Sequence, residues 1–391
     1  GDITGYQAGS TFKMFTLVAA LEKGYPLEYT INAPYQYQSK YPIRSDSPAA
    51  CPRTNKYCPV NFSKDLHGVF NMWTAFGKSV NTYFVPLQER VGAGNVVDVA
   101  KRLGIKFRSS KDATMLTEEG GVNSFGSFTL GVTDTTPLDL ANAYATLAAD
   151  GKHCEPIPVQ EIRGQDGKKL DVANPRCNQA VSTEVARAAI DAARCPVGDR
   201  SATSKCNGTT ARPTRGIVGR PVAGKTGTTD HDKTASLVAM TKQLAVAGIL
   251  ADPDWPETTQ KMDHGIVNPA VQKTLRDAMK NKPGIEFTPP SGKIVTGEQR
   301  SIPDVRCWPL DRARERLAAF GFQVDVDRLP IDSPCAANTV AGTSPDGRTI
   351  KGGVVVIKIS NGRTAPAPPP PPGQKKPPRT GPTIILPPPP G

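Results

Sequence analysis

The sequence predicts a large domain of mixed helices and strands, of α+β or α/β type, followed by a small α+β domain and a proline-rich tail. Helical patterns alternate with short apolar runs and long polar loops up to about residue 290. One helical pattern and several strand patterns follow, and the chain then becomes mainly Pro, Gly, Lys and Thr. We therefore assign a first domain to residues 1–290, a linker to 291–300, a second domain to 301–362 and a disordered tail to 363–391.

Composition narrows the classes of protein that fit. The 391 residues carry a formal net charge of +12. The longest apolar stretches, residues 244–250 and 354–357, are far shorter than the roughly 18 to 20 residues that a helix needs to span a bilayer. The basic residues are scattered, apart from a short cluster at Lys375, Lys376 and Arg379. We therefore expect a basic surface suited to a polyanionic cell wall rather than a nucleic-acid groove.

Residues 11–23 predict the first helix of the large domain. Their apolar side chains recur at helical spacing, and Gly24 is well placed as the residue that ends the helix. Ser10 would then begin a mostly buried helix. The residues at that spacing are Phe12, Phe15, Val18, Ala19 and Leu21.

Further along, a long loop separates this helix from others. Residues 35–62 are rich in Tyr, Pro, Ser and Asn, and they contain Cys51 and Cys58, which predicts a loop tied across its middle. Thr136 or its neighbour can cap a helix over residues 136–149, because Pro137 suits its first turn. Additional helical patterns cover residues 69–76, 83–90 and 96–103.

Two extended segments complete the large domain. Residues 195–216 read as a loop, and residues 217–228 and 235–250 are rich in apolar and β-branched residues. We expect these two segments to pair as antiparallel strands.

The second domain predicts a helix followed by strands. Leu310, Ala313, Leu317 and Phe320 share one helical face, which Gly321 ends. Alternation of apolar residues from Phe322 to Val326 predicts a strand, and residues 354–360 predict another. A bridge between Cys307 and Cys335 would add roughly 3 to 4 kcal/mol to so small a domain in the chain-entropy model.

The eight cysteines indicate disulfides rather than a metal site. None forms C-x-x-C, and His67, His153, His231 and His264 are not at zinc-ligand spacing. Among the connectivities that eight cysteines allow, we favour pairing in sequence order, which implies an oxidising compartment outside the cytoplasm. We expect neither a metal nor a cofactor. The favoured pairs are Cys51–Cys58, Cys154–Cys177, Cys195–Cys206 and Cys307–Cys335.

The first motif that could carry chemistry is S-x-x-K at Ser10 and Lys13. Three residues apart at a helix start, the two side chains share a face, so the amine can approach the hydroxyl. A partly buried lysine near other cations has a lowered pKa and can act as a base toward a serine nucleophile. The alternative is that Ser10 only caps the helix and Lys13 is exposed to solvent.

The second motif is Ser79-Val-Asn81, which lies between two helical patterns. A turn there can present both polar side chains to a cleft, where serine relays a proton and asparagine holds Lys13 and a substrate amide. A polar turn between helices is the alternative.

The third motif, Lys225-Thr226-Gly227, is followed by Thr228. A cation, hydroxyls and a glycine suit an edge strand that binds an extended peptide by strand addition. We expect Lys225, Thr226 and Thr228 to lie near the terminal carboxylate of that peptide.

The same stretch also matches a nucleotide-binding motif. Gly219 to Thr226 satisfies G-x-x-x-x-G-K-[ST], the phosphate-binding P-loop. A P-loop must open a helix, whereas residues 227–232 are poor helix formers and Pro221 restricts the loop. A P-loop nucleotide-binding protein remains the alternative from a second class.

Taken in order, S-x-x-K, S-x-N and K-T-G resemble the penicillin-binding and serine β-lactamase superfamily. Residues 9–13, 103–105, 131–145 and 223–229 look most like the transpeptidase domain of bifunctional, class A penicillin-binding proteins. The resemblance implies a DD-transpeptidase-like fold, in which helices flank an antiparallel sheet. Met14, Ser236, Leu237, Thr241 and Lys242 depart from the family's usual residues.

The resemblance implies a serine D-Ala-D-Ala transpeptidase or carboxypeptidase that cross-links peptidoglycan stem peptides through an acyl-enzyme. Ser10 would be the nucleophile and Lys13 its base. Ser79 would pass a proton to the leaving group, Asn81 would hold Lys13 and a substrate amide, and Lys225 to Thr228 would bind the substrate. The backbone N–H groups of Ser10 and Thr228 would hold the oxyanion. β-Lactams would stall at the acyl-enzyme.

The family also implies a location and a missing segment. Its transpeptidase domain has strands and a helix before the S-x-x-K helix, preceded by a glycosyltransferase domain and a membrane helix. Because Ser10 lies so near the start, we expect the sequence to be an N-terminally truncated fragment. We expect the protein at the extracytoplasmic face of a bacterial membrane, held there by the absent segment, with glycan strands, stem peptides and cell-wall synthesis or hydrolase proteins as partners.

Residues 302–362 resemble a single PASTA domain, with a Pro-Asp-Val opening at Pro303, a helix, an S-P-x-G turn and a closing strand. That arrangement looks most like actinobacterial class A proteins. A third hypothesis follows, in which the chain is a wall-binding or sensor module without turnover.

Overall fold

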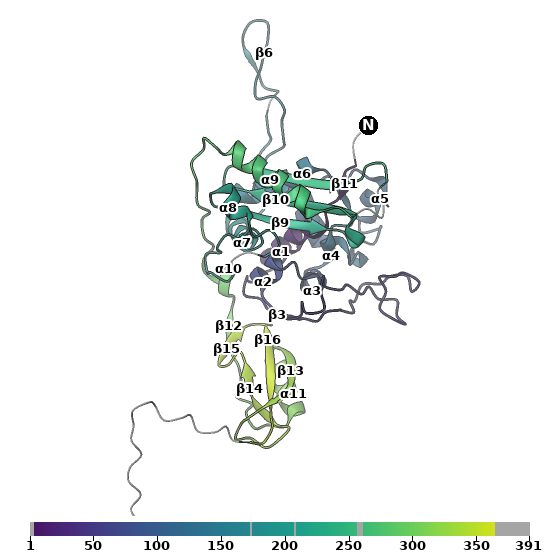
Figure 1. Cartoon of the computed structure of the whole chain (residues 1–391), viewed down its shortest axis with the longest axis vertical. Helices are drawn as coiled ribbons and strands as arrows, with labels where there is room; N and C mark the ends of the chain where they lie inside the picture. Colours follow the sequence, from purple (N-terminus) through teal and green to yellow (C-terminus); the bar gives the residue numbers. More distant parts are fainter. Residues whose placement is uncertain (1–3, 173, 207–208, 256–260, 364–391) are drawn as a thin grey trace, which may run out of the picture.

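The computed structural model describes residues 4–172, 174–206, 209–255 and 261–363. In Figure 1 these residues form a large body of helices and strands, with a smaller sheet and a helix at one end. A narrow pair of chain segments that carries β6 projects from the opposite end. The predicted proline-rich tail lies almost entirely outside the described residues.

The centre of the large body is an antiparallel sheet in the order β11–β10–β9. Its strands are β9 (Ala223–Thr228), β10 (Thr234–Met240) and β11 (Ala245–Ala251). The predicted antiparallel pairing is therefore confirmed, with Val238 opposite Lys225 in the register. Strand β9 lies at an edge of the sheet, as expected for a strand that carries K-T-G.

The predicted extents of these strands were wrong. Helix α8 (Thr214–Val218) occupies the start of the first segment, and the second segment is a hairpin of two strands. The Thr241 hydroxyl accepts hydrogen bonds from the backbone N–H groups of Gln243 and Leu244, both at 3.2 Å, which stabilises the turn. The polar residues at 241–243 are the turn signal that the apolar composition of both strands obscured.

Both faces of β10 are buried, and they pack against different partners. Val238 and Met240 join the main apolar cluster, which includes α1 (Lys13–Glu22) and α7 (Thr183–Ala193). Leu237 and Ala239 join a second cluster with α9 (His264–Ala278). This alternation is the period of two that a strand dictates. The sheet is therefore held between helices on both sides (Figure 1).

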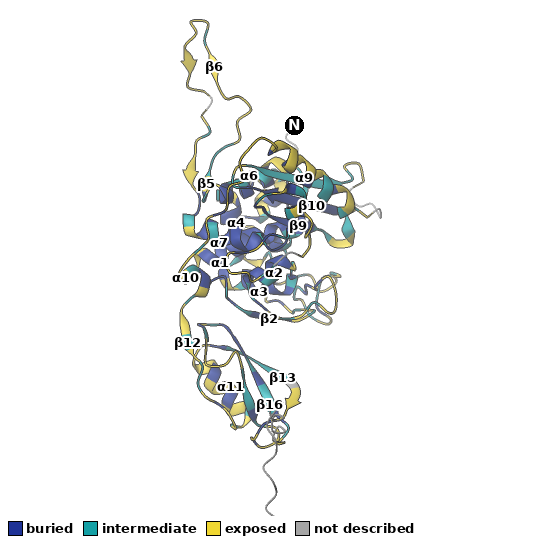
Figure 2. Cartoon of the chain, turned by 60° about the vertical axis from the view of Figure 1, so that its left-hand side comes forward, coloured by how far each residue is buried: buried dark blue, intermediate teal, exposed yellow. Residues whose placement is uncertain are grey.

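Helix α1 (Lys13–Glu22) is the most buried helix of the large body, since every residue from Lys13 to Leu21 is buried (Figure 2). The predicted helix is confirmed, and Gly24 follows its end with φ of +84°. Its first turn differs, because Gly9–Phe12 form the 3₁₀ segment η1. Ser10 thus lies in a 3₁₀ turn that leads into the helix.

The other predicted helices of the large body are confirmed with small shifts in their bounds. The Thr136 side chain caps its helix by accepting from the Asp139 N–H at 3.1 Å, with Pro137 as the first helical residue. These helices are α2 (Met72–Gly77), α3 (Asn81–Val91), α4 (Ala93–Leu103) and α6 (Pro137–Ala148). Helices α7 (Thr183–Ala193) and α9 were not predicted.

Short elements connect them. The remaining elements of the large body are β1 (Tyr6–Gln7), β2 (Ile31–Ala33), β3 (Gly68–Phe70), α5 (Ser110–Met115), η2 (Val122–Ser124), η3 (Phe128–Leu130), β4 (Asp134–Thr135), β5 (Lys152–His153), β6 (Ile162–Arg163), β7 (Lys169–Leu170), β8 (Asn178–Gln179) and η4 (Asp230–Asp232). None of the helices among the described residues is long and apolar enough to cross a membrane.

All four predicted disulfides are confirmed. Cys51–Cys58 ties the long loop of residues 35–62 across its middle, as expected. Cys154–Cys177 closes the base of the projecting segments, and Cys195–Cys206 closes the loop before α8. Cys307–Cys335 lies in the smaller unit.

The smaller unit packs one helix, α11 (Leu310–Ala319), against a sheet in the order β13–β16–β14. Ala313 and Leu317 are buried in its core as predicted, whereas Phe320 is 37% exposed and stacks under the Arg316 guanidinium instead. Its strands are β13 (Gln323–Ile331), β14 (Val340–Ser344), β15 (Arg348–Ile350) and β16 (Val354–Ser360).

The expected linker is more ordered than predicted. Residues 291–300 include α10 (Lys293–Thr296) and the start of β12 (Gln299–Ser301). The backbone N–H of Leu27 donates to the Ile294 carbonyl at 2.9 Å, so the segment is fixed to the large body. Strand β12 pairs with β15 of the smaller unit. The sequence missed this because the packing partners are distant along the chain.

Polar contacts also join the smaller unit to the large body. The Gln323 side chain donates to the Tyr29 hydroxyl at 3.0 Å and accepts from the Arg90 guanidinium at 2.8 Å. The Asn32 amide donates to the Asp325 carboxylate at 2.7 Å. Because Arg90 lies at the end of α3, the same helix that begins at Asn81 reaches the smaller unit.

Candidate active site

The three motifs come together in the interior of the large body. Ser10 lies in η1, Lys13 begins α1, and Lys225 lies on β9. Ser79 and Asn81 come from the turn between α2 and α3, as the sequence predicted. The folded chain therefore brings together segments that are up to 215 residues apart, from Ser10 to Lys225.

The Lys13 amine is fully buried and has three polar partners. It donates to the Ser79 carbonyl at 2.6 Å, to the Ser79 hydroxyl at 3.1 Å and to the Asn81 side-chain oxygen at 2.6 Å. The ring of Phe84 lies 5.8 Å from the nitrogen. An ammonium has three donors, so these contacts satisfy all of them.

Lys225, from the K-T-G motif, contacts the same Ser79 hydroxyl. It is also fully buried, and its nitrogen donates to the Ser79 hydroxyl at 2.9 Å and to the Thr226 carbonyl at 2.9 Å. The Ser79 oxygen thus accepts from both lysines. A hydroxyl has two lone pairs and one proton, so its proton is left to donate elsewhere.

Burial changes the protonation of both amines. Burial, and secondarily the charge of Lys225, lowers the pKa of Lys13 well below the usual range for lysine. Burial lowers the pKa of Lys225 to about 7. The proton therefore leaves Lys13 first, which gives the site one neutral amine that can act as a base and one cation that can bind an anion.

The backbone conformation of Ser79 directs its polar groups toward Lys13. Ser79 has φ of +58°, a left-handed conformation that is uncommon for serine and costs of order 1 kcal/mol. This conformation lets its carbonyl and its hydroxyl both face the Lys13 nitrogen. The Asn81 amide donates to the Val60 carbonyl at 2.7 Å, so the disulfide-tied loop fixes the side chain that holds Lys13.

Ser10 lines a cavity of about 790 Å³, together with Asn81 and Thr228. The turn that carries Ser10 is pressed against other backbone segments. A Cβ on Gly9 would lie 2.5 Å from the Thr228 carbonyl oxygen, and a Cβ on Gly131 would lie 2.1 Å from the Gly9 carbonyl oxygen. Both glycines also have positive φ. The Ser10 turn is therefore held directly beside the end of β9.

The K-T-G strand faces this turn at close range. A Cβ on Gly227 would lie 2.0 Å from the Ala8 carbonyl oxygen, so the glycine lets the chain's own backbone approach the strand. The close approach of a substrate backbone stays a prediction. Ser236, where relatives are often aromatic, donates to the same carbonyl at 2.8 Å. Ser236 therefore ties β10 to the residues just before Ser10.

Thr226 and Thr228 differ in what their hydroxyls contact. Thr228 lines the cavity, as expected for a group near a substrate. Thr226 is nearly buried, and its hydroxyl donates to the Thr210 hydroxyl at 2.8 Å. In this structure Thr210 engages the Thr226 hydroxyl, and the expected place of Thr226 near a carboxylate stays a prediction.

The geometry also rules out the P-loop alternative. Lys225 lies within a strand and its nitrogen points to Ser79 in the interior. The chain after Thr228 forms the short 3₁₀ segment η4 rather than a helix whose N-terminus could receive phosphate. The match to the P-loop motif is therefore coincidental.

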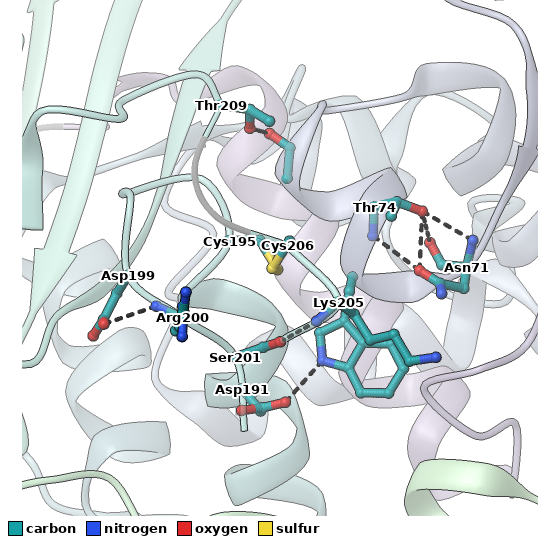
Figure 3. The surroundings of a disulfide bond; sticks show 12 residues. Asn71, Thr74, Asp191, Cys195, Asp199, Arg200, Ser201, Lys205, Cys206 and Thr209 are labelled. Carbon is teal, nitrogen blue, oxygen red and sulfur yellow. Dashed lines mark hydrogen bonds between the residues drawn. A yellow bond between two sulfur atoms is a disulfide. The ribbon is translucent and has the colours of Figure 1, made fainter. Parts of the chain in front are cut away.

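A disulfide-closed loop supports two of the motifs at once. This bridged loop comprises residues 195–206, which Cys195–Cys206 closes, and residues 209–214, which lead to α8; Figure 3 shows the disulfide beside α2. The Thr209 hydroxyl donates to the Gly77 carbonyl at the end of α2, and Thr210 accepts from Thr226 on β9. The bridged loop therefore contacts both the turn of Ser79 and the K-T-G strand.

His264 is a polar residue at the site that the sequence did not predict. His264, the first residue of α9, has its Nε2 atom 2.8 Å from the Thr228 hydroxyl. The sequence had suggested for it only the question of zinc-ligand spacing. No motif spacing links it to Thr228, so only the packing of α9 on the sheet reveals the contact.

Comparisons with known proteins agree with this geometry. Residues 3–276 match the family model described as the penicillin binding protein transpeptidase domain. The chain is 26% identical to penicillin-binding protein 1A of Aquifex aeolicus over 74% of its length and 29% identical to that of Rickettsia prowazekii over 74%. It spans 35% and 36% of those relatives, about a third of their length.

Solved structures give the same result. The structure of the PonA1 protein from Mycobacterium tuberculosis in complex with penicillin V has a TM-score of 0.54 and 28% identity, with 74% of this chain and 73% of that chain covered. Penicillin-binding protein 1A from Haemophilus influenzae has a TM-score of 0.57 with 73% and 44% covered, and at 21% identity it supports the fold alone.

The buried charge of Lys225 predicts a pH-dependent penalty to stability. Its pKa is about 7 in the folded chain and near 10.5 when unfolded, so between these values the unfolded chain binds more protons and stability rises with pH. The penalty is complete below pH 7, on the order of 5 kcal/mol, and fades toward pH 10.5. We expect Lys225→Met to stabilise the protein more, relative to wild type, at pH 6 than at pH 10.

Thermal or denaturant unfolding at pH 6, 8 and 10 measures this difference. Replacement of the exposed Lys23 by Met is the control and should give a difference that hardly changes with pH. A Lys225→Met effect that is equal at all three pH values would contradict the penalty.

The bridged loop predicts a local effect of its disulfide. Replacing Cys195 and Cys206 by Ala removes a constraint worth about 3 kcal/mol in the chain-entropy model. Because Thr209 and Thr210 would then be held less firmly, we expect faster amide hydrogen exchange in α2 and β9. Replacing Cys154 and Cys177 by Ala is the matched control, and comparable acceleration in that variant would show that the loop has no special role.

Proposed function

The chain belongs to the family of penicillin-binding protein transpeptidase domains, and from that premise we propose that it is a serine D,D-transpeptidase that cross-links peptidoglycan stem peptides. The observation that carries this proposal is the pair of buried amines, Lys13 and Lys225, that share the Ser79 hydroxyl next to the Ser10 turn. The order of the three motifs and the similarity to class A relatives support it.

The first step is acylation of Ser10. Neutral Lys13 takes the Ser10 proton, and the Ser10 oxygen attacks the carbonyl of the penultimate D-Ala of a stem peptide. The backbone N–H groups of Ser10 and Thr228 stabilise the oxyanion. The close packing of Gly9 on the Thr228 backbone supports this role, because it places the two segments side by side.

Collapse of the tetrahedral intermediate breaks the peptide bond and releases the terminal D-Ala. The leaving nitrogen takes a proton from the Ser79 hydroxyl, which is resupplied from the neighbouring lysines. The two hydrogen bonds that Ser79 accepts support this relay, since they leave its proton free to be donated. Lys225 supplies positive charge for the terminal carboxylate, and the Thr228 hydroxyl contacts it.

The acyl-enzyme is then resolved by a second nucleophile. Attack by an amine of a neighbouring stem peptide forms the cross-link and frees Ser10, whereas attack by water gives carboxypeptidase activity. β-Lactams acylate Ser10 in place of the donor peptide and stall at this stage. The similarity to the PonA1 protein that was solved in complex with penicillin V supports this assignment.

The proposed location is the extracytoplasmic side of a bacterial membrane. Disulfides persist in oxidising compartments, and every cysteine of this chain is paired. The substrate class points to the same place, because stem peptides and glycan strands lie outside the cytoplasm. Cell-wall synthesis or hydrolase proteins are the proposed protein partners.

We further propose that residues 301–362 are a PASTA domain. A helix followed by a sheet, in which the final strand β16 pairs parallel with β13 and antiparallel with β14 around a small apolar core, supports this, together with the Cys307–Cys335 bridge. Its role would be to bind the cell wall next to the transpeptidase site. Co-sedimentation with cell-wall sacculi, compared between the full chain and a chain that ends at residue 300, tests it.

Labelling with a fluorescent penicillin tests the enzymatic proposal. We expect one covalent adduct per chain for the wild type and none for Ser10→Ala, because only Ser10 is acylated. Lys13→Met should reduce the labelling rate by at least about a hundredfold, since it removes the base. Intact mass and gel fluorescence give the stoichiometry, and circular dichroism verifies that the variants are folded.

The alternatives give different outcomes. A nucleotide-binding protein would bind ATP with magnesium, lose it in Lys225→Ala and be indifferent to Ser10. A wall-binding or sensor module would co-sediment with sacculi without labelling or release of D-Ala. Absence of labelling in folded wild-type protein would refute the transpeptidase proposal.

A further inference from the structure

His264 makes a direct contact with a residue that lines the cavity. Its Nε2 atom lies 2.8 Å from the hydroxyl oxygen of Thr228, the last residue of β9. Thr228 shares the cavity wall with Ser10, and its backbone is packed against Gly9. The protonation state of His264 therefore affects the Thr228 hydroxyl, which lies next to Ser10.

The other ring nitrogen fixes the arrangement of hydrogen bonds. His264 Nδ1 lies 3.2 Å from the Asn268 side-chain oxygen, one helical turn along α9. Because an amide oxygen only accepts, Nδ1 carries a proton. In neutral His264 the Nε2 atom is then the acceptor, so the Thr228 hydroxyl donates its proton to the ring.

The helix that carries His264 is firmly seated. Val267 and Val271 of α9 are buried against the sheet, where a Cβ on Gly248 of β11 would lie 2.6 Å from the Val271 side chain. The Asp263 carboxylate caps the helix by accepting from the Gly265 N–H at 2.7 Å. His264 is thus held in place relative to Thr228 rather than placed on a free loop.

The two protonation states of His264 leave Thr228 with opposite properties. When His264 is neutral, the Thr228 proton is engaged by the ring and the hydroxyl can offer only a lone pair to the cavity. When His264 is charged, Nε2 donates to Thr228, and the hydroxyl proton becomes available to an acceptor in the cavity. Only the second state suits a carboxylate.

We propose that His264 is a positioning residue that sets Thr228 as a hydrogen-bond donor to the terminal carboxylate of the donor peptide or of a β-lactam. The proposal rests on the proposed function, since it concerns the same site. Binding of the carboxylate favours protonated His264, and protonated His264 in turn favours binding of the carboxylate, because the two equilibria are linked. A neutral ligand at the same place gains little from the proton.

Other charged groups surround the contact. Asp263 precedes His264 at the start of its helix, and Asp252 follows β11. The segment after β9 carries Asp230, His231, Asp232 and Lys233, and His231 lines the same cavity. Lys225 also titrates, with its pKa at about 7, on the same strand as Thr228. These groups are present in wild type and variant alike, so a comparison of the two isolates the contribution of His264.

The test compares wild type with His264→Gln. A glutamine side chain can donate a hydrogen bond to Thr228 but does not gain a charge between pH 5 and 8. The second-order rate constant of Ser10 acylation is measured from pH 5.5 to 8.5 with penicillin V, which carries a carboxylate, and with its uncharged methyl ester. His67→Gln, at an exposed histidine outside the cavity, is the matched control.

We expect the ratio of the wild-type to the His264→Gln rate constant to fall about tenfold from pH 5.5 to pH 8.5 with penicillin V, as one charge-assisted hydrogen bond is lost. With the methyl ester, the ratio should stay constant. His67→Gln should follow the wild type with both compounds.

Three outcomes overturn the proposal: a ratio that is constant with penicillin V, an equal fall with the ester, or the same change in His67→Gln. Each of these leaves the transpeptidase function standing, because the wild type is acylated. Folded wild type that neither compound acylates overturns the proposed function and, with it, the role of His264.

Discussion

The site depends on one physical constraint, which is that two amines are buried around a single hydroxyl. Lys13 and Lys225 both donate to Ser79, and neither is exposed to water. Two full charges at that distance in a low-dielectric interior repel strongly, so one proton must leave. A general base thus arises from burial together with the charge of Lys225, and the surrounding elements keep the two amines buried and in place.

Much of the surrounding structure supports the constraint from outside the motifs. The loop closed by Cys51–Cys58 supplies the Val60 carbonyl that orients Asn81, and the bridged loop supplies Thr209 to the end of α2. Both loops are poor in regular structure, and each is closed by a disulfide. In these two loops, disulfides thus provide the rigidity that repeated backbone hydrogen bonds provide in helices and strands.

Local patterns in the sequence predicted helices α1, α2, α3, α4, α6 and α11, the disulfides and the meeting of the motifs, but not helices α7 and α9. Helix α1 was predictable because its apolar residues recur at helical spacing, and the S-x-x-K, S-x-N and K-T-G motifs pointed to a shared cleft through family resemblance. The contacts of His264, Thr209 and Thr210 were not predictable. Each joins residues that no periodicity or spacing relates, so the information lies only in how the elements pack.

The glycines around the Ser10 turn have a consequence for how substitutions in this protein are interpreted. Gly9, Gly131 and Gly227 come from three distant segments, and at each of them a methyl group would overlap another backbone. A systematic substitution scan would score these positions as intolerant as the nucleophile itself, although none of their atoms takes part in bond making. If loss of function were the only measure, these glycines would be mistaken for residues that take part in the reaction. A measurement of the folded fraction is needed to distinguish variants that cannot fold from variants that fold but lack a reacting group.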